Sequence, residues 1–500
     1  MTHPNTAAQR GATWRLKAVS LFGAAILIVA GCAPSGVAPK SAPASAPPQA
    51  SGQSAPPASG AAKPATLNLL YAAGEADVDA IKLAIPDFEK ATGIKINLDS
   101  QPYNALQQKA FAELAAKSPF YDIMVIDTPW MPALTKQIEP LTSYIANPAI
   151  SDSKQLALDD FIPKVFYDTA VYNRDQSQLE FPGSTAKVDV AGIKSAGFDI
   201  YGLPIQANAL TMTYRKDLFE SPTEQAAFKA KYGYDLAVPK TWDEFTDVAS
   251  FFTRPASRLY GTTLMAGTGD WATDDFKTLL AGFGGNGKMV DGKFNRVFNS
   301  PEGIAALSYY SDLINKYKVT PPGVTSFSWD EAGSTYASGL TAMSMNYHNA
   351  ALNKEVAGAT AYAQIPAGKG SGPHFGTWML SVNSFSANKE WAYKAIEWFT
   401  SSAVQTKMLA KQLHPTRVSV YEAAKTSPDV ASFGNYYDIL GKSLAVGVGR
   451  PRLTNYGDVD KIIWTAVNNV ATGAATPADA LKAADAKVLD ALKKVPYPAN

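Results

Sequence analysis

The sequence predicts an α/β protein with two lobes, each a mostly parallel sheet flanked by helices. Strand and helix patterns alternate in the order β-α-β-α-β over residues 66–126, which is typical of a parallel sheet covered by helices. About 435 residues follow position 65, more than one hydrophobic core usually serves, so we expect two lobes. In such folds ligands bind at the carboxyl ends of the strands.

Each element is read from the spacing of apolar residues. Residues 67–71 indicate a strand. Val78, Ile81 and Phe88 recur at helical spacing within residues 77–92, and Gly93 is a typical helix stop. The other predicted strands are 94–98, 123–126, 210–214 and 341–345, and the other predicted helices are 105–116, 242–252, 274–283, 301–317, 390–401 and 477–492. No fixed-period repeat occurs, which argues against a solenoid.

The first 31 residues are interpreted as a secretory signal. An apolar run at 18–30 follows Arg10, Arg15 and Lys17, and it is too short to span a hydrocarbon layer of ~30 Å. The small residues just before Cys32 resemble a bacterial lipobox, in which a signal peptidase cuts before the cysteine and the thiol carries a diacylglycerol. The alternative is an ordinary signal followed by an incidental cysteine.

Residues 32–65 are predicted to be a tether. Residues 33–65 are almost all Ala, Pro, Ser or Gly, a composition that cannot bury a core. Acyl chains on Cys32 would hold the protein at a membrane surface, because each buried CH₂ contributes ~0.8 kcal/mol. The globular body then begins near Thr66.

Composition excludes several function classes for this body. The first 65 residues hold five basic residues and no acidic one, so removing them lowers the formal charge from +1 to −4. A mildly acidic body argues against nucleic acid as a partner. No apolar stretch after Cys32 approaches 18 residues, so none is expected to span a bilayer. Without cysteine the body has no disulfide and no Cys-based metal site, and four histidines outside metal-ligand spacing argue against zinc.

Aromatic residues are plentiful, with nine Trp and 23 Tyr in the chain. Their rings join an apolar face to a polar tip, which suits a ligand that is part apolar and part hydroxylated.

A series of short motifs carries a resemblance to a known family. The motifs, in chain order, are IPDFEKATGI at 85–94, YDIMVIDTPW at 121–130, GLPIQANAL at 202–210, YRKDLF at 214–219, PKTWDEF at 239–245, GLTAM at 339–343, HPTR at 414–417, and Gly473 with Ala480 and Leu481. Together they resemble the extracellular solute-binding proteins of ABC importers, specifically the carbohydrate-binding branch that includes maltose-binding protein.

The resemblance implies a periplasmic-binding-protein-like fold of two α/β lobes joined by hinge crossings, with the ligand in the cleft. The first lobe would be 66–207 plus 380–426, and the second 208–379 plus 427–500. The partners implied are a small-molecule carbohydrate and the permease subunits of an ABC transporter. The protein would be a monomer and not an enzyme, without a cofactor. It would be exported, in the periplasm or anchored to the outer face of the cytoplasmic membrane.

Candidate ligand contacts lie in loops at strand ends, where carboxylates can accept hydroxyl protons and rings can stack on sugar C–H faces. Asp127 and Trp130 follow the strand at 123–126, and Tyr71 and Glu75 follow the first strand. Alternatively, Asp127 caps a helix, Trp130 packs in the core, and Glu75 favours a helix N-terminus.

The loop at 267–271 opens with glycine and brings Gly269, Asp270 and Trp271 together, but no Gly-Lys-Ser/Thr follows, so it is not a phosphate loop. The resemblance adds residues near the crossings and late loops. These are Asn208, Tyr347, His348, Trp378, Arg417, Arg452 and Tyr456, with Arg450 in the same late segment. At Tyr347 and His348 the family often has a tryptophan. For Arg417 and the late arginines, structural ion pairing is the alternative reading.

The predicted function is a lipid-anchored receptor that captures a sugar, oligosaccharide or sugar alcohol and passes it to a membrane transporter. Three alternatives stay open. A glycosidase would use two carboxylates such as Asp127 and Asp270. A ferric-iron binder would use Tyr436 and Tyr437, and a polyamine binder would need several carboxylates around stacked aromatic rings.

Overall fold

The computed structural model describes residues 60–73, 76–347, 356, 359–495 and 497, all within one compact unit, Pro56–Asn500. The predicted signal at 1–31, Cys32, most of the tether, Glu75 and His348 lie outside the described residues. Among the helices of the described ranges, none combines the length and apolarity that crossing a bilayer requires.

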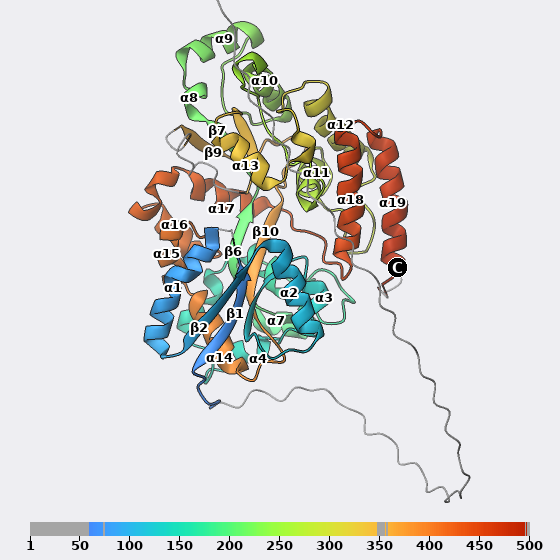
Figure 1. Ribbon diagram of the computed structural model, residues 1–500. Coiled ribbons are helices and arrows are strands. Elements are labelled where there is room, and N and C mark those ends of the chain that lie inside the picture. Colours follow the sequence, from blue (N-terminus) through green and yellow to red (C-terminus); the bar gives the residue numbers. More distant parts are fainter. Residues whose placement is uncertain (1–59, 74–75, 348–355, 357–358, 496, 498–500) are drawn as a thin grey trace, which may run out of the picture. The chain divides into compact units, whose positions relative to one another are not determined.

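The first lobe is built on a five-stranded sheet in the order β2-β1-β3-β10-β6 (Figure 1). Its strands are β1 Thr66–Ala72, β2 Lys95–Gln101, β3 Ile123–Asp127, β6 Leu203–Ala209 and β10 Phe375–Val382. β1 is parallel to β2 and β3, whereas β10 is antiparallel to β3 and β6. All five residues of β3 are buried, as expected for a strand covered on both faces.

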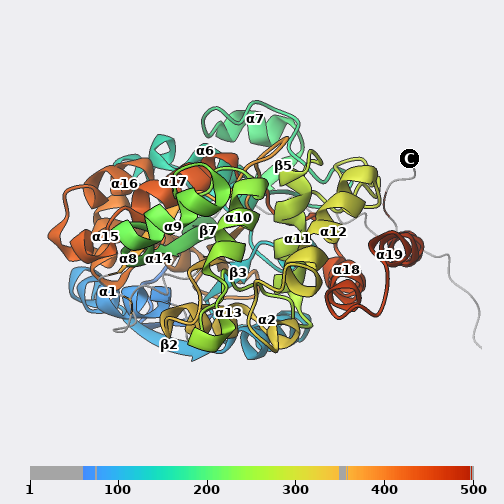
Figure 2. The ribbon, with the colours of Figure 1, turned by 90° about the horizontal axis from the view of Figure 1, so that it is seen from above.

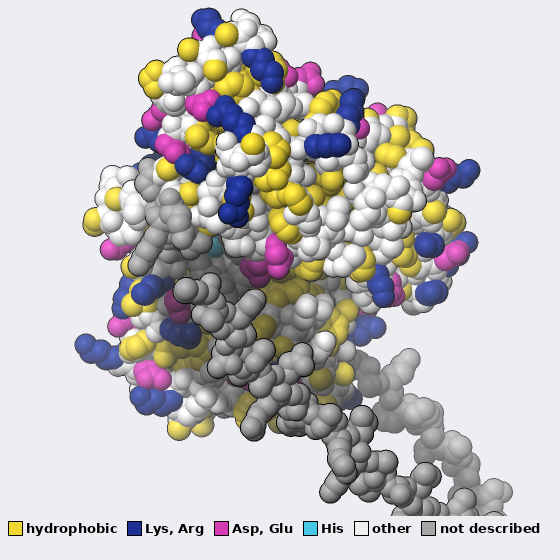
Figure 3. All heavy atoms as spheres, turned by 45° about the horizontal axis from the view of Figure 1, so that its top comes forward, with side chains coloured by type: hydrophobic (Ala, Val, Ile, Leu, Met, Phe, Trp, Pro, Cys, Tyr) yellow, Lys and Arg dark blue, Asp and Glu magenta, His cyan; other side chains and the backbone are white. Residues whose placement is uncertain are grey.

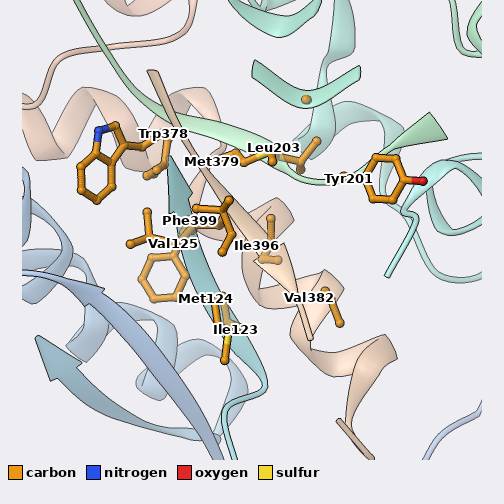
Figure 4. Close-up of a cluster of buried hydrophobic side chains, with 14 of the residues drawn as sticks. Ile123, Met124, Val125, Tyr201, Leu203, Trp378, Met379, Val382, Ile396 and Phe399 are labelled. Carbon is orange, nitrogen blue, oxygen red and sulfur yellow. The ribbon is translucent and has the colours of Figure 1, made fainter. Parts of the chain in front are cut away.

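Helices cover this sheet. They are α1 Ala76–Thr92, α2 Tyr103–Ala115, α3 Met131–Leu134, α4 Thr142–Ile145, α5 Ser153–Leu156, α6 Pro163–Ala170, α7 Val190–Ser195, α14 Lys389–Phe399, α15 Ser402–Met408 and α16 Val418–Ala424. A short antiparallel pair adds β4 Val171–Asn173 and β5 Phe198–Ile200. Figure 4 shows the core where Val125 of β3 and Met379 of β10 lie near Ile396 and Phe399 of α14. Each such buried side chain contributes about 1.5–3 kcal/mol.

The second lobe contains a three-stranded sheet in the order β8-β7-β9. Its strands are β7 Thr211–Arg215, β8 Met343–Asn346 and β9 Thr360–Ala363. β7 is antiparallel to both neighbours, so the prediction of a mostly parallel sheet is wrong for this lobe. After β7 the chain forms several helices in succession before β8, and it therefore lacks the strand-helix-strand alternation that makes the first sheet parallel.

The helices of the second lobe are α8 Lys216–Phe219, α9 Pro222–Tyr232, α10 Trp242–Phe252, α11 Asp270–Gly282, α12 Pro301–Asn315, α13 Trp329–Ala337, α18 Tyr456–Ala471 and α19 Pro477–Lys493. In Figures 1 and 2, α11, α12, α18 and α19 lie side by side, and they share one apolar core. α11 begins at Asp270, four residues before its predicted start. An acidic residue in a first turn is favourable because it faces the positive end of the helix dipole.

Within the described residues, three segments join the lobes. Leu210 alone separates β6 from β7, residues 364–374 connect β9 to β10, and residues 447–455 connect α17 Tyr436–Val446 to α18. α17 packs on β6 and also on β7 and β9, and a small apolar cluster includes Ala207 and Phe375 of the crossing strands. The two-lobed α/β fold is thus as predicted, while the residue boundaries between lobes stay predictions.

On the face in Figure 3, basic and acidic side chains are interspersed over the described surface.

Candidate ligand-binding site

A cavity of about 50 Å³ lies between the lobes, and we call it the central cavity. Its lining residues from the first lobe and its crossing strands are Tyr103, Asp127, Asn208, Gly376 and Trp378, and those from the second lobe and the late crossing are Asp270, Trp329, Tyr347 and Arg450. A wider cavity of about 640 Å³ shares Tyr103 and Asp270 with it, and a third cavity of about 270 Å³ shares Arg450. Residues far apart in the chain therefore converge on one interlobe region.

The wall from the first lobe is built on paired strands. Asp127 at the end of β3 is the register partner of Trp378 on β10. Tyr103 begins α2, and its hydroxyl donates to Asp127 Oδ2 at 2.7 Å. The Tyr103 ring lies 5.3 Å from the ring of Trp130 and 5.7 Å from that of Trp378, centroid to centroid. These three rings form an aromatic surface beside a carboxylate.

The wall from the second lobe is built on the first turns of helices. Asp270 and Asp274 lie one turn apart on α11, and Trp329 is the first residue of α13, where Ser328 and Glu331 form a capping box. The ring of Trp329 meets that of Trp271 edge-on at 5.0 Å. It also meets Tyr103 of the other lobe edge-on at 6.2 Å. Aromatic rings from both lobes therefore touch across the interface.

Arg450 is the cation at the centre of this region. Its Nη2 donates to Asp274 Oδ2 at 2.8 Å and to Asp270 Oδ2 at 3.1 Å, and its Nη1 lies 4.0 Å from Asp127 Oδ2. The side chain is 8% exposed. Burial acts to lower the pKa of Arg450, but the carboxylates of Asp274 and Asp270 outweigh burial and raise this pKa well above its usual value. Arg450 thus stays charged and links three carboxylates from two lobes.

The pKa values of two neighbouring carboxyl groups are raised as well, but here burial is the cause. Burial raises the pKa of Asp127 to about 6 and that of Asp274 to about 6, although Arg450 opposes both shifts. Asp274 Oδ2 also accepts the hydroxyl of Tyr347 at 2.7 Å, and that hydroxyl contacts His374 Nδ1. Burial lowers the pKa of His374 well below its usual value, so its ring is neutral at pH 7.

Several buried polar atoms in this region have no hydrogen-bond partner among the described residues. Four of them belong to residues that line the cavities, namely Asp127 Oδ1, Trp130 Nε1, Trp271 Nε1 and Arg450 Nε, and two others are Asp274 Oδ1 and His374 Nε2, which lie 3.3 Å apart. Buried polar atoms in folded proteins are nearly always hydrogen-bonded, to protein or to ordered water. The four atoms on cavity-lining residues are one acceptor and three donors, a set that a molecule offering both kinds of group could satisfy.

The structure brings most of the predicted contact residues to the three cavities. Asp127, Asn208, Asp270, Tyr347 and Trp378 line the central cavity; Trp130, Gly269, Trp271 and Tyr456 line the wider cavity; and Arg452 lines the third. Tyr71 is buried in β1 and lines none of the three. Contact with a ligand stays a prediction for every one of these residues.

Arg417 is placed differently from its predicted role. It is fully buried, and its guanidinium donates to the backbone carbonyls of Thr400, Ala157 and Leu156. The guanidinium also lies 3.8 Å from the centre of the Phe161 ring. Because these groups surround it and it lines none of the three cavities, Arg417 holds the first lobe together rather than facing the cleft.

Arg452 connects the late crossing to the first lobe. Its guanidinium donates to the carbonyls of Val171 and Tyr167 and lies 4.6 Å from the centre of the Tyr172 ring. These bonds occupy two of its donor groups, and we infer that Arg452 serves chiefly to position the crossing.

Tyr103, Trp329 and Asp274 were missed by the sequence analysis, and Arg450 was not among its selected contacts. Trp329 could have been recognised in the sequence as the start of a helix, because Ser328 and Glu331 have capping-box spacing. Tyr103 follows the residues of β2 after Pro102, so strand-end reasoning could have found it. Asp274 had no local signal, since its partners Tyr347 and Arg450 are distant in the chain.

Comparison with known proteins defines the class of protein. Residues 72–406 match the bacterial extracellular solute-binding protein family, and the chain belongs to this family.

Relatives of known name or structure agree with this assignment. A probable ABC transporter-binding protein of Deinococcus radiodurans is 25% identical over 421 residues, covering 81% of this chain and 88% of the relative. The maltose-bound MalE3 structure of T. maritima is 25% identical with a TM-score of 0.68, covering 85% of this chain and 99% of that one. A solute-binding protein of Agrobacterium radiobacter in complex with ribitol has the same identity and TM-score, covering 86% of this chain and all of that one.

Proposed function

We propose that this chain is the substrate-binding component of an ABC importer and that it captures a carbohydrate between its lobes. The ligand would be a mono- or oligosaccharide or a sugar alcohol. The observation that carries the proposal is the central cavity, where aromatic rings and hydrogen-bonding groups from both lobes are interleaved. Sugar hydroxyls need such donors and acceptors, and sugar C–H faces lie well on rings. The maltose and ribitol bound by the similar structures support this assignment.

Lobe closure would couple binding to transport. The central cavity is large enough for only a few waters, so a sugar would enter when the lobes are apart and be enclosed when they close. Because the ligand touches both lobes only in the closed form, binding shifts the population toward that form. The permease would recognise the closed form of the monomer.

We also propose anchoring through a lipid on Cys32, at the outer face of the cytoplasmic membrane. The basis is the apolar run and the small residues before Cys32. After expression in a bacterium, Cys32→Ser should move the protein from the membrane fraction to the soluble fraction. Equal membrane retention of both forms would contradict the anchor.

The protein is proposed to bind its ligand without altering it. Against the iron alternative, Tyr437 donates its hydroxyl to the carbonyl of Leu413, and Tyr436 lies buried on the same helix. The polyamine alternative is favoured by one observation, the carboxylates of Asp127 and Asp270 beside aromatic rings. The glycosidase alternative is tested by incubating the protein with a chromogenic glycoside, where release of the chromophore would contradict pure binding.

The deciding experiment is a thermal-shift screen over mono- to tetrasaccharides and polyols, followed by calorimetry of the hits. A bound ligand raises the melting temperature by mass action. Trp329→Ala should weaken binding of each hit about tenfold or more, because it removes a ring from the cavity wall. Trp391→Ala on α14, which lines none of the three cavities, is the matched control. Failure of every carbohydrate to bind would overturn the proposal.

A further inference from the structure

Negative charge exceeds positive charge around the central cavity. Asp127 and Asp270 line it and Asp274 lies directly behind Arg450, which is the one cationic side chain among the described lining residues. Lys277 is nearby, but its Nζ donates to the carbonyls of Val448 and Gly449, and burial lowers its pKa well below the usual value. Three carboxylates thus share one guanidinium.

Of the three carboxylates, Asp127 is the one whose negative charge is least neutralised. Arg450 donates to Asp274 and Asp270, whereas its nearest approach to Asp127 is 4.0 Å. Asp127 Oδ2 accepts instead from the neutral hydroxyl of Tyr103. Asp127 Oδ1 has no hydrogen-bond partner among the described residues, although the residue is only 2% exposed. A buried carboxylate whose cationic partner is 4.0 Å away and shared with two other carboxylates is costly, so a donor that also carries positive charge would fit best here.

The surrounding rings favour the same kind of group. Tyr103, Trp329, Tyr347 and Trp378 line the cavity that Asp127 lines. A cation near the face of an aromatic ring is attracted by the ring's electron density, most strongly where water is excluded. The aromatic rings and the incompletely neutralised carboxylate of Asp127 together favour binding of an ammonium group.

The free donors limit which cation can bind. Arg450 Nε, Trp130 Nε1 and Trp271 Nε1 are buried without acceptors among the described residues, in or beside the central cavity. A fully protonated polyamine carries donors only, so it cannot satisfy these three groups. A hydroxylated molecule supplies the missing acceptors.

We propose that the carbohydrate captured by this protein carries a protonated amine, as in an amino sugar or an amino polyol, and that the ammonium binds Asp127 Oδ1 within the aromatic walls. This inference rests on the carbohydrate function proposed above and specifies its substrate class.

The test is calorimetry of the whole protein body at pH 7 with pairs of ligands that differ by one amine. Suitable pairs are glucosamine with glucose, galactosamine with galactose, and 1-amino-1-deoxysorbitol with sorbitol. N-acetylglucosamine is a neutral control that keeps the nitrogen, and putrescine tests the polyamine alternative. In at least one pair the amine should bind about ten- to a hundredfold more tightly, as expected for a charge-assisted hydrogen bond.

Asp127→Asn provides the matching variant, since it keeps the shape of the side chain and removes its charge. It should reduce the preference, the ratio of the Kd of the neutral sugar to that of its amine, to less than about threefold. Asp438→Asn, on the exposed side of α17, is the control that keeps the full preference. If Asp127→Asn does not fold, the ligand pairs measured on the unaltered protein still decide the matter.

The outcomes separate the two proposals. Neutral sugars that bind as tightly as their amines, or N-acetylglucosamine that matches glucosamine, would overturn the amine inference and leave the carbohydrate function standing. Binding of putrescine alone, or of none of these compounds and no sugar in the thermal-shift screen, would overturn both.

Discussion

The guanidinium groups of Arg417 and Arg450 are both buried, but the groups that surround them differ. Arg417 faces three backbone carbonyls and the Phe161 ring, with Asp160 at 3.6 Å. Arg450 faces carboxylates from α11 and from β3. Burial lowers the pKa of Arg417 to about 10, whereas carboxylates raise the pKa of Arg450.

The difference separates an arginine that pairs mainly with backbone carbonyls from one that lies among several carboxylates. The carbonyls around Arg417 are fixed by their helices and loops and already accept from its guanidinium, so this region needs no further hydrogen-bond partner. The Arg450 region contains more carboxylate charge than its guanidinium balances, and it lies at cavities. A ligand can therefore balance the carboxylate charge around Arg450, whereas the region around Arg417 leaves no such role for one.

The largest effect is expected for Arg450→Met. The substitution leaves Asp274 and Asp270 without a cationic partner, so the free energy of unfolding should fall by about 3–5 kcal/mol at pH 7. At pH 5 the loss should be smaller, because the pKa of Asp274 is about 6 even with Arg450 present and rises further without it. Urea unfolding at both pH values measures this. An equal loss at pH 5 and pH 7 would show that Arg450 acts through packing alone.

Arg417→Met sharpens the comparison. It leaves the carbonyls of Thr400, Ala157 and Leu156 without their donor, and a loss of about 3 kcal/mol is expected from such unpaired groups. Carbonyls do not titrate, so the loss should be the same at pH 5 and pH 7. Calorimetry of a sugar found in the screen should give the same affinity as the unaltered protein. A tenfold loss of affinity would restore the sequence-based role of Arg417 as a ligand contact.

A pH dependence is expected from Asp275, which follows Asp274 on α11. Its Oδ2 accepts from the neutral donors Met265 N at 2.8 Å and Tyr310 Oη at 3.1 Å, and burial raises its pKa to about 7. The folded state therefore holds the proton more tightly than the unfolded state, whose carboxyl has a pKa of about 4. The contribution of Asp275 to stability is therefore greatest at low pH. Through this group the free energy of unfolding falls by about 2 kcal/mol from pH 5 to pH 7.

Asp275→Asn should remove that share of the pH dependence. Asp127 and Asp274, whose pKa values are also raised by burial, keep a slope of the same sign in the variant. Urea unfolding between pH 5 and pH 7 compares the two proteins. A slope in the variant as steep as in the unaltered protein would contradict the assignment of Asp275.

The comparison also shows how far the sequence could predict this molecule. Apolar spacing and strand-helix order predicted β1, α1, β2, α2 and β3 within a few residues, because the apolar pattern of each element is local in the sequence. The antiparallel sheet of the second lobe was not foreseen, since β7 pairs with strands more than 100 residues later in the chain.

Site prediction had the same limit. Asp127 and Asp270, which line the central cavity, were selected because strand ends and helix starts are visible in the sequence. Arg417 and Arg450 both stand within two residues of a proline, and their hydrogen-bond partners lie up to 261 and 180 residues away, so sequence alone could not tell the structural arginine from the one at the cavity. Long-range pairing, rather than residue type, decides which buried charge is available to a ligand.

The smallest effect is expected where a cation is exposed. Lys288 pairs with Glu180 across the third cavity, but their side chains are 35% and 52% exposed. Water and salt screen such a pair, so Lys288→Ala should change the free energy of unfolding by less than about 1 kcal/mol. The control is Leu179→Ala, which removes a buried side chain from the segment that carries Glu180 and should cost more. Urea unfolding of both variants measures this, and a larger loss for Lys288→Ala than for Leu179→Ala would mean that charge, rather than apolar packing, holds this segment against the second lobe.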